Sequence, residues 1–501
     1  MGNINPAYGS LTPSQQQLAL QGNYLAFNTG GANDFIQQYL PEVYEAEVER
    51  YGNRTLSGFL RMVGAEMPMT SDQVIWSEQN RLHVAYSNVT LPAGPNSTTL
   101  TFVTGGTTTV QNAIFPNDTI VVMNPATGVT IKGVVGQSVN NAALTLATIT
   151  CYPFQAQNWD ALGAGGTNLK MFVYGSVFAK GTFGPTAQGG AAGSVKSIQP
   201  SFTQFSNQPI ILKDSFQING SDMAQIGWVE VATEDGTSGY LWYLKSESET
   251  RLRFDDYLEM SMVEGELAAP AAGGASIRFA DQATGAVPGF SVAGGASVAH
   301  GTQGLFAAIQ ARGNVMAGFS GGTGISDFDQ VLKNLDTQGA IEENMLFLNR
   351  SLDLDFDDML GQISSGQAGG TAYGLFENSE DMALNLGFSG FRRGSYDFYK
   401  TSWKYLNDAS TRGGVAVSGI EGVLIPAGTS TVYDQQLGTN IRRPFLHVRY
   451  RASQTEDRRY KNWITGSAGG AYTTALDAMQ VNWLSERCLV TQAANNFVLF
   501  Q

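Results

Sequence analysis

The sequence predicts an α+β protein, in which helices and strands are mixed without the regular strand–helix–strand alternation of a parallel sheet. Three observations predict this class. Apolar side chains alternate with a period of two from Val74, short strands with turn sequences crowd residues 92–182, and Ser238–Glu264 is strongly helical. With 501 residues, 43% of them hydrophobic, the chain is long and apolar enough for two to four domains.

Charged residues are scarce in this chain. They make up 14% of it, against about 25% in an ordinary soluble domain. A folded chain with so few charges leaves much neutral or apolar surface, which usually lies against another subunit. The alternative is a β protein, rich in Gly, Ser and Thr, whose surface is polar but uncharged. The net charge of −14 argues against a dedicated nucleic-acid binder, but it is compatible with enclosing DNA without gripping it.

The cysteines and the N-terminal residues indicate the cellular compartment in which the protein folds. Cys151 and Cys488 are too few for a disulfide framework or a four-ligand zinc site, so we expect two buried thiols. Met1–Pro6 carries neither a basic region nor an apolar run, so we expect no signal peptide. No stretch of about 18 apolar residues occurs, so we expect no membrane span and folding in a reducing cytoplasm.

The first third of the chain is predicted to change from helix to strand. Residues 1–66 read as an amphipathic helical arm, with a helix start at Thr12-Pro13 and a second helix over Asn33–Tyr51. Alternation through Leu82–Tyr86 predicts a long strand from Val74. Residues 92–182 predict a small barrel or sandwich, and a Gly/Ala-rich linker follows at 184–193. The expected strands of this β module carry Leu100 and Phe102, Ile120–Met123, Val129 and Ile131, Leu144 and Leu146, and Met171–Phe178.

The strongest predicted helix follows a strand over Ile210–Ile218. Ser238 can cap this helix and Gly265 can end it. Glu247–Arg251 and Glu249–Arg253 form i,i+4 pairs in the favourable order. At 1.5 Å per residue it spans roughly 40 Å, and a helix charged round much of its circumference tends to lie across a surface. Its apolar thread consists of Leu241, Leu244, Leu252, Leu258 and Met262.

Loops, closing strands and two further helices are predicted for the rest of the chain. Two Gly-rich stretches, 266–304 and 361–374, read as long loops. Closing strands are expected at Val423–Ile425, Phe445–Arg451 and Phe497–Phe500. Two capped helices are also expected, one after Ile325-Ser326 with Phe328, Val331, Leu332 and Leu335 that ends at Gly339, and one capped by Ser395 with Tyr396, Tyr399, Trp403 and Leu406.

Two sequence motifs resemble a catalytic motif and a metal-binding motif, and neither is complete. Gly318–Gly322 matches the Gly-x-Ser-x-Gly elbow with Ser320 as nucleophile, but glycines continue to Gly324, so the segment reads as a flexible turn. A triad would also need one of only three histidines, which are His83, His300 and His447.

The acidic run Asp353–Asp358 resembles the start of a calcium loop. Its sixth position is Asp358 rather than Gly, and its twelfth is Ser364 rather than Glu. We therefore predict no metal, cofactor or catalytic site. The favoured reading is a solvated acidic strand or helix face with three apolar side chains turned inward, namely Leu352, Leu354 and Phe356.

One cluster of basic residues interrupts the acidic chain near its end, and aromatic residues interleave with it. Arginine with aromatics is typical of protein interfaces, so we favour contact with acidic surface of a neighbouring subunit over a DNA patch. The expected acidic partners are the Asp353–Asp358 run and Glu247, Asp255, Asp256 and Glu259 of the long helix. The candidate interface residues are Glu247, Glu249, Arg251, Arg253, Asp255, Asp256, Arg442, Arg443, Arg449, Arg451, Arg458 and Arg459; Lys461 also belongs to the basic cluster.

The order of elements resembles a known fold. A helical arm, a β excursion, a strand leading into a long charged helix, an α+β region and terminal strands are similar to the Hong Kong phage-type major capsid fold of tailed bacteriophages. The resemblance is closest to capsid proteins of crAss-like phages. It rests on Phe202–Phe205, Ile211–Ser221, the helix that follows, and Gly422–Gly428.

The resemblance implies a division of the chain. Residues 1–66 would be the N-terminal arm, and 67–206 an extended loop in which the β module at about 92–182 is an insertion. Residues 207–300 would form a peripheral domain around the spine helix 238–264, 301–440 an axial domain, and 441–501 strands that return to both.

The resemblance also implies a function. The chain would be a structural subunit, not an enzyme, that self-assembles as hexamers and pentamers into an icosahedral capsid around double-stranded DNA. Its partners would be further copies and the portal, scaffold and auxiliary capsid proteins, without a membrane. It would lie in the virion after assembly in the bacterial cytoplasm. A tail, baseplate or fibre protein is the main alternative, and a glycosidase or esterase is a third, disfavoured by the three histidines.

Overall fold

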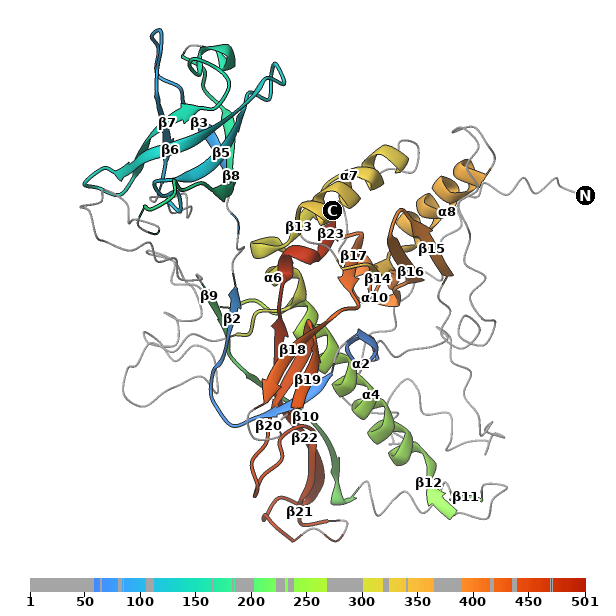
Figure 1. Ribbon diagram of the computed structural model, residues 1–501. Helices are drawn as coiled ribbons and strands as arrows, with labels where there is room; N and C mark the ends of the chain where they lie inside the picture. Colours follow the sequence, from blue (N-terminus) through green and yellow to red (C-terminus); the bar gives the residue numbers. More distant parts are fainter. Residues whose placement is uncertain are drawn as a thin grey trace, which may run out of the picture. The chain divides into compact units, whose positions relative to one another are not determined.

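The computed structural model divides the chain into two units, Trp76–Phe205 and the residues on either side of it. Figure 1 shows the elements of both units. The predicted arm helices, most of the two Gly-rich loops and Ser320 lie outside the described residues. These comprise 58–63, 65–79, 83, 85–104, 112–163, 165–182, 184, 202–221, 230–232, 238–267, 301–318, 324–338, 341–364, 389–414, 419–434, 439–468, 470 and 472–501.

The unit Trp76–Phe205 contains a six-stranded antiparallel barrel with the strand order β3-β8-β5-β6-β7-β4. Thr90, which follows β3, exchanges backbone hydrogen bonds of 2.8 and 3.0 Å with Thr101 of β4, so the sheet closes on itself. The strands alternate apolar-in, and Trp159 fills the centre with its indole N–H donating to the Cys151 carbonyl at 3.0 Å. The strands are β3 (Ala85–Val89), β4 (Thr99–Val103), β5 (Asp118–Met123), β6 (Thr130–Asn140), β7 (Leu146–Pro153) and β8 (Leu169–Ser176); η2 (Asp160–Leu162) follows β7.

Two details of the sequence prediction are wrong in this region. The single strand expected from Val74 is two strands, β2 (Val74–Gln79), which pairs with β9 (Phe202–Asn207), and β3. Leu144 is not on a strand but in a turn, with a positive φ of 54° and an exposed fraction of 65%. The Asn141 side chain accepts the backbone N–H groups of Thr145 and Leu146, and this closes the turn.

The larger unit contains a five-stranded sheet with the long helix laid across it. Strand β22 is central, because it pairs with β10 along one edge and with β20 and then β21 along the other, while β1 pairs with β20. Phe254 and Leu258 of helix α4 (Leu241–Glu264) are buried against Ile218 of β10 and Trp483 of β22. The strands are β1 (Glu66–Met69), β10 (Ile210–Asn219), β20 (Leu446–Arg451), β21 (Lys461–Gly466) and β22 (Ala478–Thr491).

The predicted long helix is confirmed over Leu241–Glu264, but its predicted start at Ser238 is wrong. Ser238–Tyr240 is strand β12, which pairs with β11 (Glu230–Ala232). Because the helix begins at Leu241, its cap position is Tyr240, so Ser238 lies two residues too early to cap it.

A six-stranded mixed sheet forms the second half of the larger unit, in the order β13-β23-β17-β14-β16-β15. Phe328, Val331 and Leu335 of α7 (Gly324–Gln338) and Leu352 and Phe356 of α8 (Arg350–Ser364) share a core with it, which confirms the predicted α7 face. The strands are β13 (Asn314–Met316), β14 (Glu343–Leu348), β15 (Ser389–Arg393), β16 (Tyr396–Ser402), β17 (Gly422–Pro426) and β23 (Val498–Phe500).

The helix predicted after Ser395 is wrong. Tyr396–Ser402 is β16, and only Lys404–Asn407 (α10) is helical. Tyr396, Phe398 and Lys400 are buried while the residues between them are half-buried, so the burial period is two, as in a strand.

A second core joins the two sheets of the larger unit. It is formed by apolar residues from α2 (Phe59–Val63), the end of α4, α6 (Leu305–Arg312) and facing strands of both sheets. Phe59 stacks on Trp403 with ring centroids 4.2 Å apart, and it meets Phe347 of β14 edge-on at 4.7 Å. The remaining described elements are β18 (Thr429–Asp434), which pairs with β19 (Thr439–Pro444), and the short turns η4 (Arg412–Gly414) and η5 (Ala494–Asn496).

Candidate interaction surfaces

The predicted basic cluster builds an ion-pair network inside the chain. Both carboxylate oxygens of Glu486, a residue that is only 7% exposed on β22, lie 2.6 Å from guanidinium nitrogens of Arg451 and Arg458. Glu66 of β1 pairs with Arg459 and lies 3.6 Å from Arg487 of β22. We call Glu66, Arg451, Arg458, Arg459, Glu486 and Arg487 the β1–β22 charge network.

This network fastens β1 and the turn before β21 to the central strand. Arg451, Arg458 and Arg459 already have carboxylate partners in the same chain, and Arg451 also pairs with Asp72. A contact between these arginines and a neighbouring subunit therefore stays a proposal.

The other members of the basic cluster have separate positions. Arg442 and Arg443 lie on β19, and Arg449 of β20 donates to the Pro68 carbonyl at 3.3 Å. Lys461 pairs with Glu456 and lies 5.9 Å from the Trp463 ring centroid. The Arg459 guanidinium lies 5.5 Å from the Tyr450 ring centroid, so part of the interleaving of cations and aromatics is explained by contacts within the chain.

The charged residues of α4 hold the helix on its sheet. Arg253 donates to both carboxylate oxygens of Asp214 on β10 at 3.0–3.2 Å. Arg251 and Asp255 hydrogen-bond to Tyr460, whose pKa is raised to about 12, chiefly by burial. The other three predicted interface residues of α4 are half-buried, namely Glu247, Glu249 and Asp256.

Glu259 joins the long helix to the segment that precedes β1. Its two carboxylate oxygens accept the backbone N–H groups of Gly58 at 3.0 Å and of Leu60 at 3.1 Å, at the start of α2. Burial raises the pKa of Glu259, against the opposing effect of these hydrogen bonds and of nearby Arg487 and Arg61. Sequence reasoning placed Glu259 only among the acidic partners of arginines, because nothing local links it to a segment about 200 residues earlier.

Lys400 is a buried cation that sequence reasoning missed. It is 4% exposed on β16, and its ammonium lies 2.8 Å from the Asp353 carboxylate and 2.5 Å from that of Asp357. Two members of the predicted acidic run are thus partners of a core lysine rather than freely solvated. Leu352 and Phe356 are buried as predicted, but Leu354 is 54% exposed, because the run is helical and only the i,i+4 pair shares a face.

Several large apolar side chains are exposed on the β21–β22 hairpin. Trp463 and Ile464 on β21 are 36% and 49% exposed, and Tyr472 and Leu476 in the connecting loop are 86% and 51% exposed. Among the described strands β21 pairs only with β22.

No described residue forms a catalytic arrangement of the kind the motifs suggested. His447 is 1% exposed in β20, with Nδ1 3.0 Å from the Pro444 carbonyl oxygen. Within the described residues, no group of three His, Cys, Asp or Glu side chains is placed to hold a metal ion. None of the helices in the described part of the chain is both long and apolar enough to cross a membrane.

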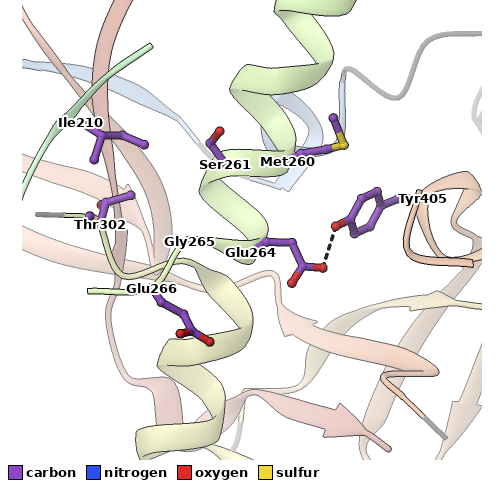
Figure 2. Close-up of a pocket in the computed structure, with 9 residues that line it drawn as sticks. Ile210, Met260, Ser261, Glu264, Gly265, Glu266, Thr302 and Tyr405 are labelled. Carbon is purple, nitrogen blue, oxygen red and sulfur yellow. Dashed lines mark hydrogen bonds between the residues drawn. The ribbon is translucent and has the colours of Figure 1, made fainter. Parts of the chain in front are cut away.

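A shallow pocket of about 450 Å³ lies at the end of α4 (Figure 2). One of its two carboxylates, that of Glu264, accepts the Tyr405 hydroxyl at 2.6 Å and pairs with Arg412 at 2.6 Å. This carboxylate therefore stabilises the fold. The pocket is lined by Ile210, Met260, Ser261, Glu264, Gly265, Glu266, Gly301, Thr302 and Tyr405, which include no histidine or lysine to activate Ser261.

Comparison with known proteins returns phage structures at low similarity. No protein-family model and no curated protein matches the chain. The chain is similar to a solved structure from Gordonia phage Cozz (8% identity, TM-score 0.37, covering 97% of this chain and 98% of that one). It is also similar to a structure from Microbacterium phage Oxtober96, with 10% identity and a TM-score of 0.36 over 92% of this chain and 95% of that one. A third similar structure, "Asymmetric unit of bacteriophage PhiM1 mature capsid", has 7% identity and a TM-score of 0.36 over 94% of each chain. Similarity at this level carries no argument about function.

Proposed function

We propose that this chain is the major capsid protein of a tailed phage, a structural subunit that assembles as hexamers and pentamers into an icosahedral shell around double-stranded DNA. One observation carries the proposal. The helix α4 lies across the β10–β22 pair, and the barrel unit is inserted in the chain between two strands of the same sheet, β1 and β10. That order of elements is the one that the Hong Kong phage-type resemblance implies.

The parts of the chain receive roles under this proposal. Residues 1–66 are the arm, whose base is held to the spine helix by the Glu259 contacts with Gly58 and Leu60. Residues 67–206 are the extended loop that carries the barrel. Residues 207–300 are the peripheral domain, 301–440 the axial domain, and 441–501 return to both.

The surface composition supports assembly. Only 14% of residues are charged, and the β21–β22 hairpin exposes four large apolar side chains. Weak contacts of this kind add up in a closed symmetric shell. The net charge of −14 disfavours gripping DNA, so the shell encloses the genome without sequence-specific contacts.

The proposal includes the binding partners of the protein and its location. The partners are further copies of the chain, the portal, a scaffold and auxiliary capsid proteins, and the relatives expected to be closest are those of crAss-like phages. The protein is assembled in the bacterial cytoplasm and resides in the virion. No catalytic step is assigned to it.

Negative-stain electron microscopy of the full chain, produced with and without its scaffold protein, tests this function. We expect rings of five and six subunits or closed polyhedral shells. Long tubes or fibres without rings would instead indicate a tail or fibre protein. A chain that stays monomeric at high concentration with the scaffold present would contradict the proposal.

A further inference from the structure

The outer surface of the barrel carries a group of half-exposed aromatic side chains. Tyr152 and Phe154, at the end of β7, are each 52% exposed, and Phe172 and Tyr174 of β8 are 48% and 50% exposed. We call these four residues the aromatic face.

The pairing of the strands places these four side chains near one another on the barrel. Phe172 is paired with Val121 of β5, Val121 is paired with Lys132 of β6, and the Phe154 N–H donates to the Lys132 carbonyl at 3.0 Å. The Lys132 ammonium lies 6.0 Å from the Tyr174 ring centroid. The aromatic face therefore runs across four adjacent strands, β8, β5, β6 and β7.

The barrel does not need this face for its own core. The residues next to these aromatics along β7 and β8, such as Cys151 and Met171, point inward and are buried. Pairing of aromatics across strands adds some stability to a sheet, but it does not require four side chains to stay about half exposed. Together they leave roughly 300–500 Å² accessible, as large as the largest patch on a typical monomer.

The charge of the barrel indicates what covers this face. Residues 85–178 contain only two lysines, Lys132 and Lys170, and two aspartates, Asp118 and Asp160, so this stretch is formally neutral within a chain of net charge −14. Two copies of the chain can approach through the barrel without the like-charge repulsion that their other surfaces produce. The patch is about half of the ~800 Å² per partner in a stable complex, so the contact is weak alone and effective when it is repeated.

We propose that the aromatic face docks on a second copy of this chain within the assembly. The inference rests on the proposed function and adds to it a surface for contact between subunits. An auxiliary protein that covered the same face would be a different result of the tests below.

Photo-crosslinking tests the occupant directly. The full chain is made with p-benzoylphenylalanine at position 174, and at position 103 as a control. Val103 on β4 is 57% exposed, and it pairs with Leu146, at the opposite end of β7 from Tyr152 and Phe154. A mixture of ¹⁴N- and ¹⁵N-labelled copies is irradiated under assembly conditions with scaffold. We expect mixed-isotope crosslinks between copies from position 174 only. Crosslinks within one copy alone, crosslinks to another protein, or equal yields from both positions would overturn the proposal.

A pair of variants tests the consequence for assembly. We expect Phe172→Ser/Tyr174→Ser to require at least about tenfold more protein for assembly than wild type, since the apolar contact is lost at every copy. Val103→Ser should assemble like wild type, and thermal unfolding verifies that both variants are folded. If wild type assembles and the double variant does so equally well, this inference fails while the proposed function stands. If wild type forms no shells or rings, the proposed function fails, and crosslinking from position 174 still decides whether copies meet at this face.

Discussion

Several charged side chains are buried in the described part of this fold, and those of the central strand β22 have partners within the chain. Glu486 and Arg487 occupy the middle of the central strand β22 and are each only 7% exposed. Removal of such charges from water is costly unless carboxylate and guanidinium meet. The β1–β22 charge network provides that pairing, and so it allows charged residues in a strand that is otherwise buried.

The first prediction concerns Glu486. We expect Glu486→Gln to lower the free energy of unfolding by about 2 kcal/mol, because Arg458 loses its anion and Arg451 keeps only the exposed Asp72. Glu456→Gln is the control. It removes an exposed pair with Lys461 and should cost about 0.5 kcal/mol. Urea denaturation measures both, and equal losses would show that the network does not stabilise the fold.

The second prediction concerns the two thiols, which are both buried as the sequence predicts. Burial raises the pKa of Cys151 and of Cys488 to about 12, so both are protonated at pH 8 and neither offers a thiolate. We expect a thiol reagent at pH 8 to react with neither cysteine in the native protein and with both after unfolding in urea. Rapid native labelling of either one would be inconsistent with these buried sites.

Among the secondary-structure elements, the spacing of apolar residues and pairing with neighbouring strands decide whether a segment forms a helix or a strand. The spacing of Phe328, Val331 and Leu335 fits the helix that forms, and Phe216 and Ile218 alternate as the strand requires. The segment Tyr396–Leu406 carries aromatics at both spacings, and pairing with β14 and β15 selects the strand over Tyr396–Ser402. The 14-residue strand β22 was missed altogether, because Ser485-Glu486-Arg487 in its middle reads as a polar break.

The third prediction concerns the contact between α2 and α4. Burial raises the pKa of Glu259 above its ordinary value of 4.5, so the folded state binds the proton more tightly than the unfolded state does. This contribution to stability is fully present below pH 4.5 and is lost as the pH rises through the raised value. We expect the unfolding free energy of wild type, relative to Glu259→Gln, to fall between pH 4.5 and pH 7.

Urea denaturation across this pH range measures the difference, and Glu456→Gln controls for the loss of one carboxylate. A wild-type advantage that is constant or grows with pH would show that Glu259 does not titrate in this way.

Over the whole molecule, charged and apolar side chains at the surface have different surroundings. The described charged residues around α4 and β22 are largely engaged within the chain, whereas the β21–β22 hairpin and the aromatic face expose apolar side chains. Under the proposed function these apolar surfaces carry the contacts between subunits.

The fourth prediction follows from that separation. We expect Ile464→Ser/Tyr472→Ser to leave the thermal unfolding midpoint within about 2 °C of wild type, because Ile464 is half exposed and Tyr472 almost fully exposed. We also expect it to reduce shell formation, since assembly would bury these side chains. Leu144→Asn, at an exposed turn position, should change neither property. Normal assembly of the double variant, measured by light scattering and electron microscopy, would remove the hairpin from the contacts.

Features that depend on neighbouring residues can be derived from the sequence alone. The α+β class, the apolar face of α7, the body of the long helix, the strand Ile210–Asn219 and the burial of both cysteines all follow from spacing and composition. The folded arrangement of the chain is needed to see that the β module closes into a barrel through Thr90 and Thr101 and that β22 is the central strand. It also decided the partners of Glu259, Glu486 and Lys400. The physical reason is that each of these depends on hydrogen bonds or ion pairs between residues far apart in the chain, and a repeating local pattern carries no information about which distant group will supply the partner.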